Sequence, residues 1–425
     1  MQTYKEYKQI GLPWLDQIPA HWKVQRAKTM FRKMNRPVSD SDEVITCFRD
    51  GEVTRRSNRR TTGFTEAIKE TGYQGIRKGD LVIHVMDAFA GAVGVSDSDG
   101  KGTPVYSVCT PIGDYNNHYY ATIIRIMAKT GYIQSLYRGI RERSSDFRFE
   151  VFAEQYLPIP PREEQDAIVR FLDAKCSKID SLIKIKERQI TLLNEMKQNI
   201  INKAVTRGLD PNAPMKDSGV DWIGEIPEGW EVLRCKYLFT ETNFRSEKGE
   251  ETHLSMSQKY GLVPDSMMEE RRMLSESYAG GKLCIKDDIV LNRLKAHLGV
   301  FALASQDGVV SPDYTVLSIN KDKIFPKYAE YILKSCSCRR ELVIRVHGIV
   351  NGFLRLYTED FNEIKLPVPI IEEQKKIIDF VSNVEHVTIN KINIFKKIID
   401  LMKDYRQRLI SDVVTGKIKI LENKL

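Results

Sequence analysis

The sequence lacks the motifs by which the common enzyme classes are recognised. SDGKGT at 98–103 contains glycine and lysine without the spacing of a phosphate-binding P-loop, and GxGxxG, GxSxG and HExxH are all missing. The Asn-Pro-Pro-aromatic motif that amino-methyltransferases use on a flipped base is missing too. We therefore expect a chain that is not an enzyme by itself and that uses no cofactor.

Cysteine and histidine are scarce. The seven cysteines form no CxxC, Cys336 and Cys338 form a single CxC, and the seven histidines are isolated. This pattern predicts reduced thiols in the cytoplasm and no metal site. The polar N-terminus lacks the apolar core of a signal peptide, and no apolar run approaches the ~20 residues that a membrane span needs.

The balance of charge is only moderately basic. The net charge of +8 and the 42% hydrophobic content are those of an ordinary globular protein. Such a charge has two interpretations, a solvated basic surface or a surface that binds a polyanion. The clustering of the basic residues has to decide between them.

What the sequence does contain is an internal repeat of about half its length. LPIPPREEQ, from Leu157, returns as LPVPIIEEQ, from Leu366, at a shift of 209 residues. WLDQIPAHWKV, from Trp14, returns as WIGEIPEGWEV, from Trp222, at a shift of 208. A repeat of this kind predicts two similar domains within one chain.

Matches continue between these landmarks, but not everywhere. KGDLVI at 78–83 corresponds to KDDIVL at 286–291, a turn followed by a strand-like run. The segment 49–64 has no counterpart in 257–274. A shared scaffold with divergent loops is how two sites of different specificity are built on one fold.

Two residue types within the repeat have a structural interpretation. The tryptophans, Trp14 and Trp22 in the first copy and Trp222 and Trp230 in the second, are expected to be packing anchors rather than ligand contacts. The pairs Glu163-Glu164 and Glu372-Glu373 lie in the first turn of a helix, where the macrodipole favours anions. Contact with a partner protein is the alternative for these carboxylates, because adjacent helical positions diverge too far to share a substrate.

Each copy ends in a long helix. From Glu163 to Ala204 there is no proline or glycine, which predicts a rod of roughly 60 Å. Apolar residues recur in a 4–3 pattern along both helices, as coiled-coil pairing requires. The predicted seam contains Ile183, Ile190, Leu193 and Ile200 of the first helix and Ile392, Phe395, Ile399, Met402 and Leu409 of the second. The alternative is two amphipathic helices that each pack on their own globular unit, but matched seams favour antiparallel pairing with each other.

These patterns predict an α+β chain with two similar α/β domains joined by two long helices. The expected division is residues 1–156 and 220–365 for the domains, 157–206 and 366–425 for the helices, and 207–219 for a linker rich in proline, glycine and aspartate.

Basic residues gather in loops of both halves. A single cluster is commonly a solvated face, but clusters in both halves with tyrosine and phenylalanine nearby favour DNA, since Lys and Arg attract phosphates and Arg also pairs with guanine. The candidate DNA contacts are Arg55, Arg56, Arg59, Arg60, Arg141, Arg143 and Arg148 in the first half and Arg293, Lys295, His297, Arg345 and Arg355 in the second.

Together these features resemble the specificity subunit of type I restriction–modification systems. The resemblance rests on WIGEIPEGWEV, the LPxP…EEQ entry to a long helix, the terminal VVTGKI and the half-length repeat, and it covers residues 11–420. It implies two target-recognition domains that each read one half of a split double-stranded DNA sequence. It also implies an antiparallel coiled coil that sets the spacer, two docked methylase subunits, restriction and translocase subunits where present, and no active site in this chain.

Two other functions compete with this one. A scaffold protein would use the repeat and the coiled coil for assembly only, without reading DNA. A single-chain restriction enzyme would need nuclease and methylase motifs, which this sequence does not contain.

Overall fold

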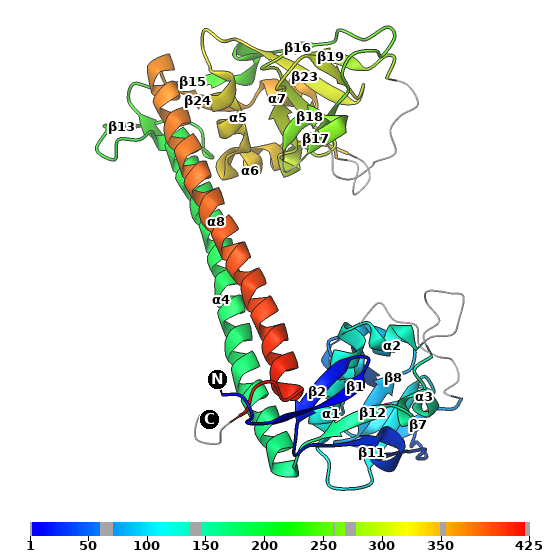
Figure 1. The fold of residues 1–425 in the computed structure, drawn as a ribbon. Coiled ribbons are helices and arrows are strands. Elements are labelled where there is room, and N and C mark those ends of the chain that lie inside the picture. The colour runs from blue at the N-terminus through cyan, green and yellow to red at the C-terminus, as the bar shows by residue number, and fades with distance from the viewer. Residues whose placement is uncertain are drawn as a thin grey trace. The chain divides into compact units, whose positions relative to one another are not determined.

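Two long helices run through the chain, α4 (Arg162–Arg207) and α8 (Ile371–Val414), and they lie antiparallel (Figure 1). The structure is a computed structural model, and it describes residues 2–59, 71–136, 146–257, 260–267, 278–348 and 354–420. The chain divides into two compact units, residues 1–185 with 398–425 and residues 186–397. Each unit therefore holds part of both long helices.

The first unit contains one four-stranded antiparallel sheet and several two-stranded ribbons. The sheet has the order β4-β11-β8-β9, and the ribbons are β1-β2, β3-β12, β5-β6 and β7-β10. The strands are β1 (Tyr7–Leu12), β2 (Leu15–Pro19), β3 (Lys23–Arg26), β4 (Phe31–Lys33), β5 (Ile45–Cys47), β6 (Val53–Arg55), β7 (Gln74–Ile76), β8 (Leu81–His84), β9 (Val93–Val95), β10 (Gly100–Gly102), β11 (Tyr106–Pro111) and β12 (Tyr156–Ile159). The helices are α1 (Asn117–Lys129), α2 (Tyr132–Ser135) and α3 (Phe149–Ala153), with the 3₁₀ turns η1 (Ala27–Thr29), η2 (Arg56–Asn58) and η3 (Ala88–Ala90).

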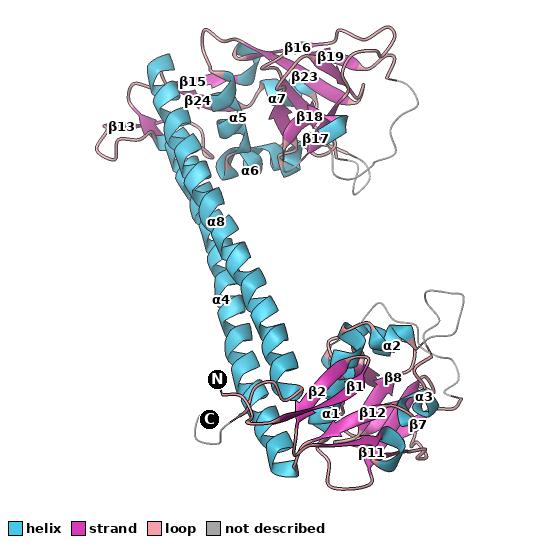
Figure 2. Ribbon diagram, in the orientation of Figure 1, coloured by secondary structure: helices cyan, strands magenta, loops and turns pink. Residues whose placement is uncertain are grey.

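The second unit repeats this plan (Figure 2). Its four-stranded sheet has the order β16-β23-β20-β21, and its ribbons are β13-β14, β15-β24, β17-β18 and β19-β22. The strands are β13 (Met215–Asp217), β14 (Glu225–Pro227), β15 (Glu231–Arg234), β16 (Phe239–Thr242), β17 (Leu254–Ser257), β18 (Gly261–Pro264), β19 (Lys282–Cys284), β20 (Ile289–Asn292), β21 (Phe301–Leu303), β22 (Gly308–Val310), β23 (Tyr314–Ile319) and β24 (Lys365–Val368). The helices are α5 (Pro326–Lys334), α6 (Cys336–Ile344) and α7 (Thr358–Asn362), with η4 (Cys235–Tyr237), η5 (Asp265–Met267) and η6 (Ala296–Leu298). Every sheet of one unit thus has a counterpart of the same connectivity in the other.

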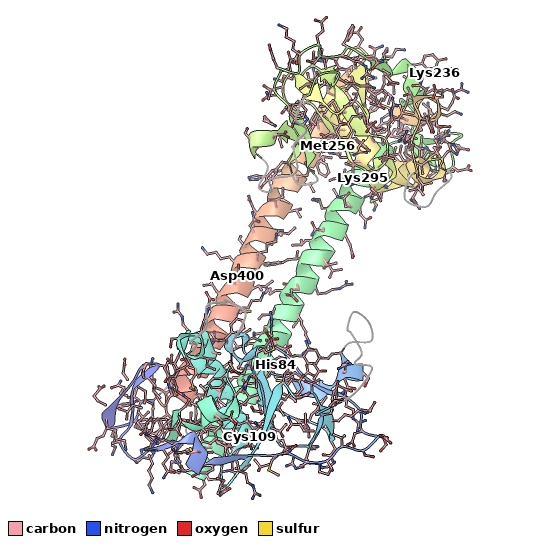
Figure 3. The ribbon with its side chains drawn as sticks, turned by 90° about the vertical axis from the view of Figure 1, so that its right-hand side faces the viewer. His84, Cys109, Lys236, Met256, Lys295 and Asp400 are labelled. Carbon is pink, nitrogen blue, oxygen red and sulfur yellow. The ribbon has the colours of Figure 1, made fainter. Side chains whose placement is uncertain are left out.

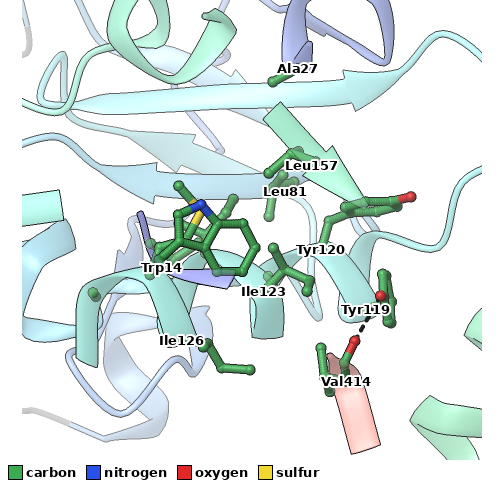
Figure 4. Packing of buried hydrophobic residues seen from close by; sticks show 14 of the residues in the cluster. Trp14, Ala27, Leu81, Tyr119, Tyr120, Ile123, Ile126, Leu157 and Val414 are labelled. Atoms are coloured by element: carbon green, nitrogen blue, oxygen red, sulfur yellow. Dashed lines mark hydrogen bonds between the residues drawn. The ribbon is translucent and has the colours of Figure 1, made fainter. Parts of the chain in front are cut away.

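The predicted fold class is therefore confirmed. The repeat seen in the sequence is a repeat of strand order, and β13 forms within the segment predicted as a linker. In the first unit the sheet packs on α1, whose Tyr119, Tyr120 and Ile123 are fully buried (Figure 4).

The core of each unit includes the ends of both long helices. In the first unit Ile168 and Phe171 of α4 join the same cluster as Leu409 and Val413 of α8. In the second unit Ile201 and Val205 of α4 join Ile377 and Val381 of α8. The ends of the long helices therefore pack on the domains, as the alternative of two separate amphipathic helices predicted. That alternative does not account for the antiparallel pairing of α4 with α8.

Candidate nucleic-acid interface and its helical frame

The EEQ motif fastens the start of each long helix to its domain through the glutamine. Gln165 donates to the carbonyl of Pro160 at 2.9 Å, and its Oε1 accepts from the backbone of Asn116 at 2.9 Å. Gln374 makes the same pair of contacts, with Pro369 at 2.9 Å and Phe325 at 2.7 Å. Both glutamines are buried, so each amide joins the proline run to the entry of α1 or α5.

The second glutamate of the motif binds a tryptophan. The indole of Trp22 donates to Glu164 at 3.0 Å, and the indole of Trp230 donates to Glu373 at 3.0 Å. Tyr4 also donates to Glu164, at 2.8 Å. The predicted packing role of Trp22 and Trp230 agrees with their burial, but the macrodipole describes only part of what these carboxylates do.

Each domain also holds the last turn of the helix that began in the other copy. Tyr119 of α1 donates to the carbonyl of Val414, at the end of α8, at 2.9 Å (Figure 4). Tyr328 of α5 donates to the carbonyl of Val205, near the end of α4, at 3.1 Å. The helix ends lack intrahelical partners for these carbonyls, so the two tyrosines supply them.

Between their ends the helices pair with each other. The predicted seam residues Ile183, Ile392, Ile399 and Leu409 are buried, whereas most of their neighbours along the helices are exposed. Across the seam, Arg406 pairs with Asp180 in the first unit, and Lys186 Nζ lies 4.6 Å from the Phe395 ring centroid in the second. The remaining predicted seam residues, Ile190, Leu193, Ile200, Phe395 and Met402, are partly buried.

The basic candidates of the first domain lie in two places. Arg55 ends β6 and pairs with Glu43 at 2.6 Å, and Arg56 opens η2. Arg59 pairs with Asp50 and Glu52, both at 2.8 Å, and these hydrogen bonds, led by the one to Asp50, raise the pKa of its guanidinium. Arg148 precedes α3 and pairs with Asp146 at 2.6 Å. Arg60, Arg141 and Arg143 lie outside the described residues.

The basic candidates of the second domain lie on adjoining segments. The backbone of Leu356 donates to the carbonyl of Arg293 at 3.1 Å, and Arg355 and His347 form a β-bridge. Lys295 is exposed (Figure 3), as is Arg355, while Arg345 pairs with Glu341 at 2.6 Å. His297 lies in η6, and its side chain is not described. The fold thus brings Arg293, Lys295 and Arg355 together from distant parts of the sequence.

Arg293 belongs to a partly buried ionic cluster. It pairs with Glu241 at 2.9 Å, and Lys282 pairs with the same carboxylate at 3.2 Å. Burial alone would raise the pKa of Glu241, but hydrogen bonds from Thr358 and Lys282 and the two cations hold it below its usual value. Arg293 therefore has a structural partner, and Lys295 and Arg355 are the better placed of this group to meet a phosphate.

Comparison with known proteins relates part of the chain to one family. Residues 227–399 match the family described as type I restriction modification DNA specificity domain. The chain is 24% identical over 286 residues to the type I restriction enzyme MjaVIII specificity subunit of Methanocaldococcus jannaschii, and 26% identical over 272 residues to the putative MjaX specificity subunit of the same organism. The chain is therefore similar to specificity subunits of type I restriction–modification systems, and residues 227–399 match their DNA specificity domain.

The first match covers 64% of this chain and 64% of the relative, and the second covers 62% and 59%. The chain therefore spans less than two thirds of the length of these two specificity subunits.

Solved structures agree with this fold. A chain from a type I R-M system, described for its complex assembly and conformational transition, superimposes with a TM-score of 0.70 at 13% identity, over 94% of this chain and 99% of that one. The HsdS subunit from Thermoanaerobacter tengcongensis gives a TM-score of 0.56 at 14% identity, over 94% and 98%. The two superpositions support the fold of this chain, including its antiparallel pair of long helices.

Two kinds of site were sought in the part of the chain that the structure describes. No helix there is long and apolar enough to cross a bilayer, and no group of three His, Cys, Asp or Glu side chains could hold a metal ion. The functional contacts that sequence reasoning missed are Glu164–Trp22 and Glu373–Trp230. Their only sequence signal is that both partners recur at nearly the same shift.

Proposed function

We propose that the chain is the non-catalytic DNA-specificity subunit of a cytoplasmic type I restriction–modification complex. Residues 1–156 and 220–365 each read one half of a split target on double-stranded DNA. The helices in 157–206 and 366–425 set the spacer between the half-sites and dock two methylase subunits, and restriction and translocase subunits join where they exist. The chain itself binds no metal or cofactor in this proposal.

One observation carries this proposal: two domains of the same strand order are fastened to the same helix pair by equivalent contacts. Gln165, Trp22 and Tyr119 in one unit correspond to Gln374, Trp230 and Tyr328 in the other. Arg56 opens η2 in the first unit, whereas Asp265 opens η5 in the second. Two domains that contact the long helices in the same way but carry different loops are suited to recognise two different sequences.

Exposed apolar side chains on the helices support the docking of partner subunits. In the first unit Leu401 and Tyr405 are 58% and 52% exposed on one side of α8. In the second unit their counterparts on α4, Leu192 and Met196, are 46% and 59% exposed. Ile185 and Ile394, also at a shift of 209, are 53% and 57% exposed. Each unit thus presents one copy of the same apolar stripe, as two identical helical partners would require.

The decisive experiment is to co-express the chain with its methylase and to map methylated adenines across a genome by long-read sequencing. We expect methylation at a bipartite sequence with a constant spacer. Replacing residues 49–64 is expected to change one half-site only, with the other half-site as the internal control. A change in both half-sites would contradict the division of labour between the domains.

A second experiment tests the spacer. Adding or removing one heptad in one of the long helices is expected to change the permitted spacer or to prevent assembly, because the paired seam must stay in register. The bases read in each half-site should not change. Altered half-sites with an unchanged spacer would show that the helices do not act as a spacer.

The scaffold alternative predicts a different outcome of DNA footprinting. A specificity subunit with its methylase protects two separated segments of a target duplex. Quadruple replacement of Arg55, Arg56, Arg59 and Arg60 by alanine is expected to weaken binding and to flatten its salt dependence. A complex that gives no footprint at any salt concentration would favour the scaffold.

A further inference from the structure

The two units differ at the helix that faces the long helices. On α5, Glu330 pairs with Lys327 at 2.8 Å and with Lys334 at 2.7 Å, and it is buried. At a shift of 209, the position of Glu330 is Ala121 on α1 and the position of Lys334 is Arg125. The first unit therefore keeps the cation and lacks the carboxylate that neutralises it.

Arg125 has no partner to replace that carboxylate. Its Nε–H is shielded from solvent and donates to no acceptor among the described residues, and none of the ion pairs of the described chain includes Arg125. The guanidinium packs against Gly51, where a side chain would collide with it. Burial lowers the pKa of Arg125, and the charge of Asp50 offsets only part of this effect. A partly buried guanidinium without an ion pair is costly, so an anion bound beside it would stabilise this arrangement.

A cavity of about 340 Å³ opens beside this side chain. It is lined by α1, α4 and the last part of α8, and Lys129 and Arg406 also face it. Two carboxylates line it as well, Asp50 and Asp173. Asp50 is held by Arg59 at 2.8 Å, and Arg406 by Asp180, so Arg125 and Lys129 are the cations that lack an acidic partner. Lys129 donates to the amide oxygen of Gln407 and forms no ion pair with the described residues.

We propose that this cavity binds a small phosphate-bearing molecule, with Arg125 and Lys129 as its cationic ligands. The volume is that of a small-ligand site, and a planar guanidinium suits bidentate contact with a phosphate. The bound anion supplies the negative charge that Glu330 supplies in the second unit. Because the cavity lies between α1 and α8, the ligand ties the first domain to the end of the second long helix.

The test is calorimetric titration of the full-length chain with inorganic phosphate, without DNA or methylase, at constant ionic strength. We expect saturable binding of one phosphate per chain. Arg125→Gln and Ala121→Glu are each expected to weaken it by about tenfold or more. The first removes a charged hydrogen bond, and the second places a carboxylate four residues before Arg125, where it can pair with the guanidinium. Thermal unfolding should show phosphate stabilising the wild-type chain and not these variants.

Lys334→Gln is the matched control, because it removes the equivalent cation of the second unit, which Glu330 already pairs. Phosphate affinity should stay within twofold of the wild type. No saturable binding, an unchanged affinity in Arg125→Gln, or an equal loss in Lys334→Gln would each overturn the proposal. Circular dichroism of each variant checks that a loss of binding is not a loss of folding.

DNA is the other source of phosphate, and a second arm separates it from a free molecule. The DNA affinity of Arg125→Gln is measured across a range of salt concentrations. An unchanged salt slope supports a free phosphate-bearing ligand. A slope that falls by about one, with no binding of inorganic phosphate, would assign Arg125 to the DNA backbone and overturn the small-ligand site. Neither result depends on whether the chain reads a split target.

Discussion

The first and second units make the same contacts with the long helices, but charged residues at equivalent positions have different partners. Asp80 and Asp288 are both buried at the same turn, and each accepts a backbone hydrogen bond, from Arg77 at 2.8 Å and from Ile285 at 3.0 Å. In the first unit Arg36 forms a bidentate pair with Asp80. The corresponding position in the second unit is Phe244, which is 72% exposed.

This difference shows which parts of the repeat are constrained. Both units have the same backbone contact. The amide of Gly75 donates to the carbonyl of Arg36 at 2.9 Å, and the amide of Leu283 donates to the carbonyl of Phe244 at 2.8 Å. The side chains at these two positions differ. The fold therefore depends on the strand pairing and not on a particular ion pair. Asp288 is left without a cation, and burial raises the pKa of its carboxyl.

The strongest comparison is between Trp22→Ala and Trp230→Ala. Both side chains are almost fully buried, so each change is expected to lower the free energy of unfolding of its own unit by about 3–5 kcal/mol. Trp22 should cost more because Tyr4 and His21 also pack on its ring. Hydrogen exchange measured peptide by peptide checks this. Equal loss of protection in both units from one substitution would contradict separate cores.

Asp80→Asn and Asp288→Asn are expected to act in opposite directions at neutral pH. Asp80→Asn leaves Arg36 without its partner and should cost about 3 kcal/mol. Asp288→Asn should stabilise the second unit, because it removes an unpaired buried carboxylate.

The raised pKa of Asp288 fixes how this second effect depends on pH. A group whose pKa is raised on folding favours the folded state at low pH, and this contribution is lost as the pH rises through the folded pKa. The advantage of Asp288→Asn should therefore grow with pH. Urea denaturation at pH 5 and at pH 8 measures it, and an advantage that shrinks between these two values would refute the assignment.

Gly416→Ala and Gly208→Ala compare the ends of α8 and α4. Both glycines have positive φ, 78° and 73°. A methyl group at Gly416 would lie 2.6 Å from Pro19 and 2.8 Å from Trp22, whereas at Gly208 it would lie 3.3 Å from Trp230. We expect losses of about 2 kcal/mol or more for Gly416→Ala and about 1 kcal/mol for Gly208→Ala. Thermal unfolding ranks the two, and the reverse order would be inconsistent with this packing.

The smallest expected effect comes from Glu164→Gln and Glu373→Gln. Each change keeps an acceptor for the indole and removes the charge, so each should cost about 1 kcal/mol. The change at Glu164 should lower the free energy of unfolding more than the change at Glu373. Glu164 accepts hydrogen bonds from Tyr4 and Trp22, and it also lies 2.6 Å from His21. Matched denaturation curves of the two variants decide, and a larger loss at Glu373 would mean that the extra contacts of Glu164 contribute nothing.

Local patterns in the sequence were enough to predict much of this protein. The two long helices follow from stretches without proline or glycine, and they span Arg162–Arg207 and Ile371–Val414. The seam follows from heptad spacing, because residues three and four apart lie on one side of a helix. The repeat of LPxP…EEQ and of the tryptophan motif predicted two domains of one fold. The assignment of DNA contacts to particular arginines stays a prediction.

Only the tertiary structure decided which residues meet across the chain. Arg59 looks like a free cation in the sequence, but the fold brings Asp50 and Glu52 to it, both at 2.8 Å. Nothing local shows that Tyr119 holds Val414, 295 residues away, since that contact depends on the antiparallel return of α8. Hydrophobic periodicity and helix-breaking residues act over a few positions and are visible in the sequence. The neutralisation of charges and the holding of helix ends depend on distances that exist only after the chain has folded.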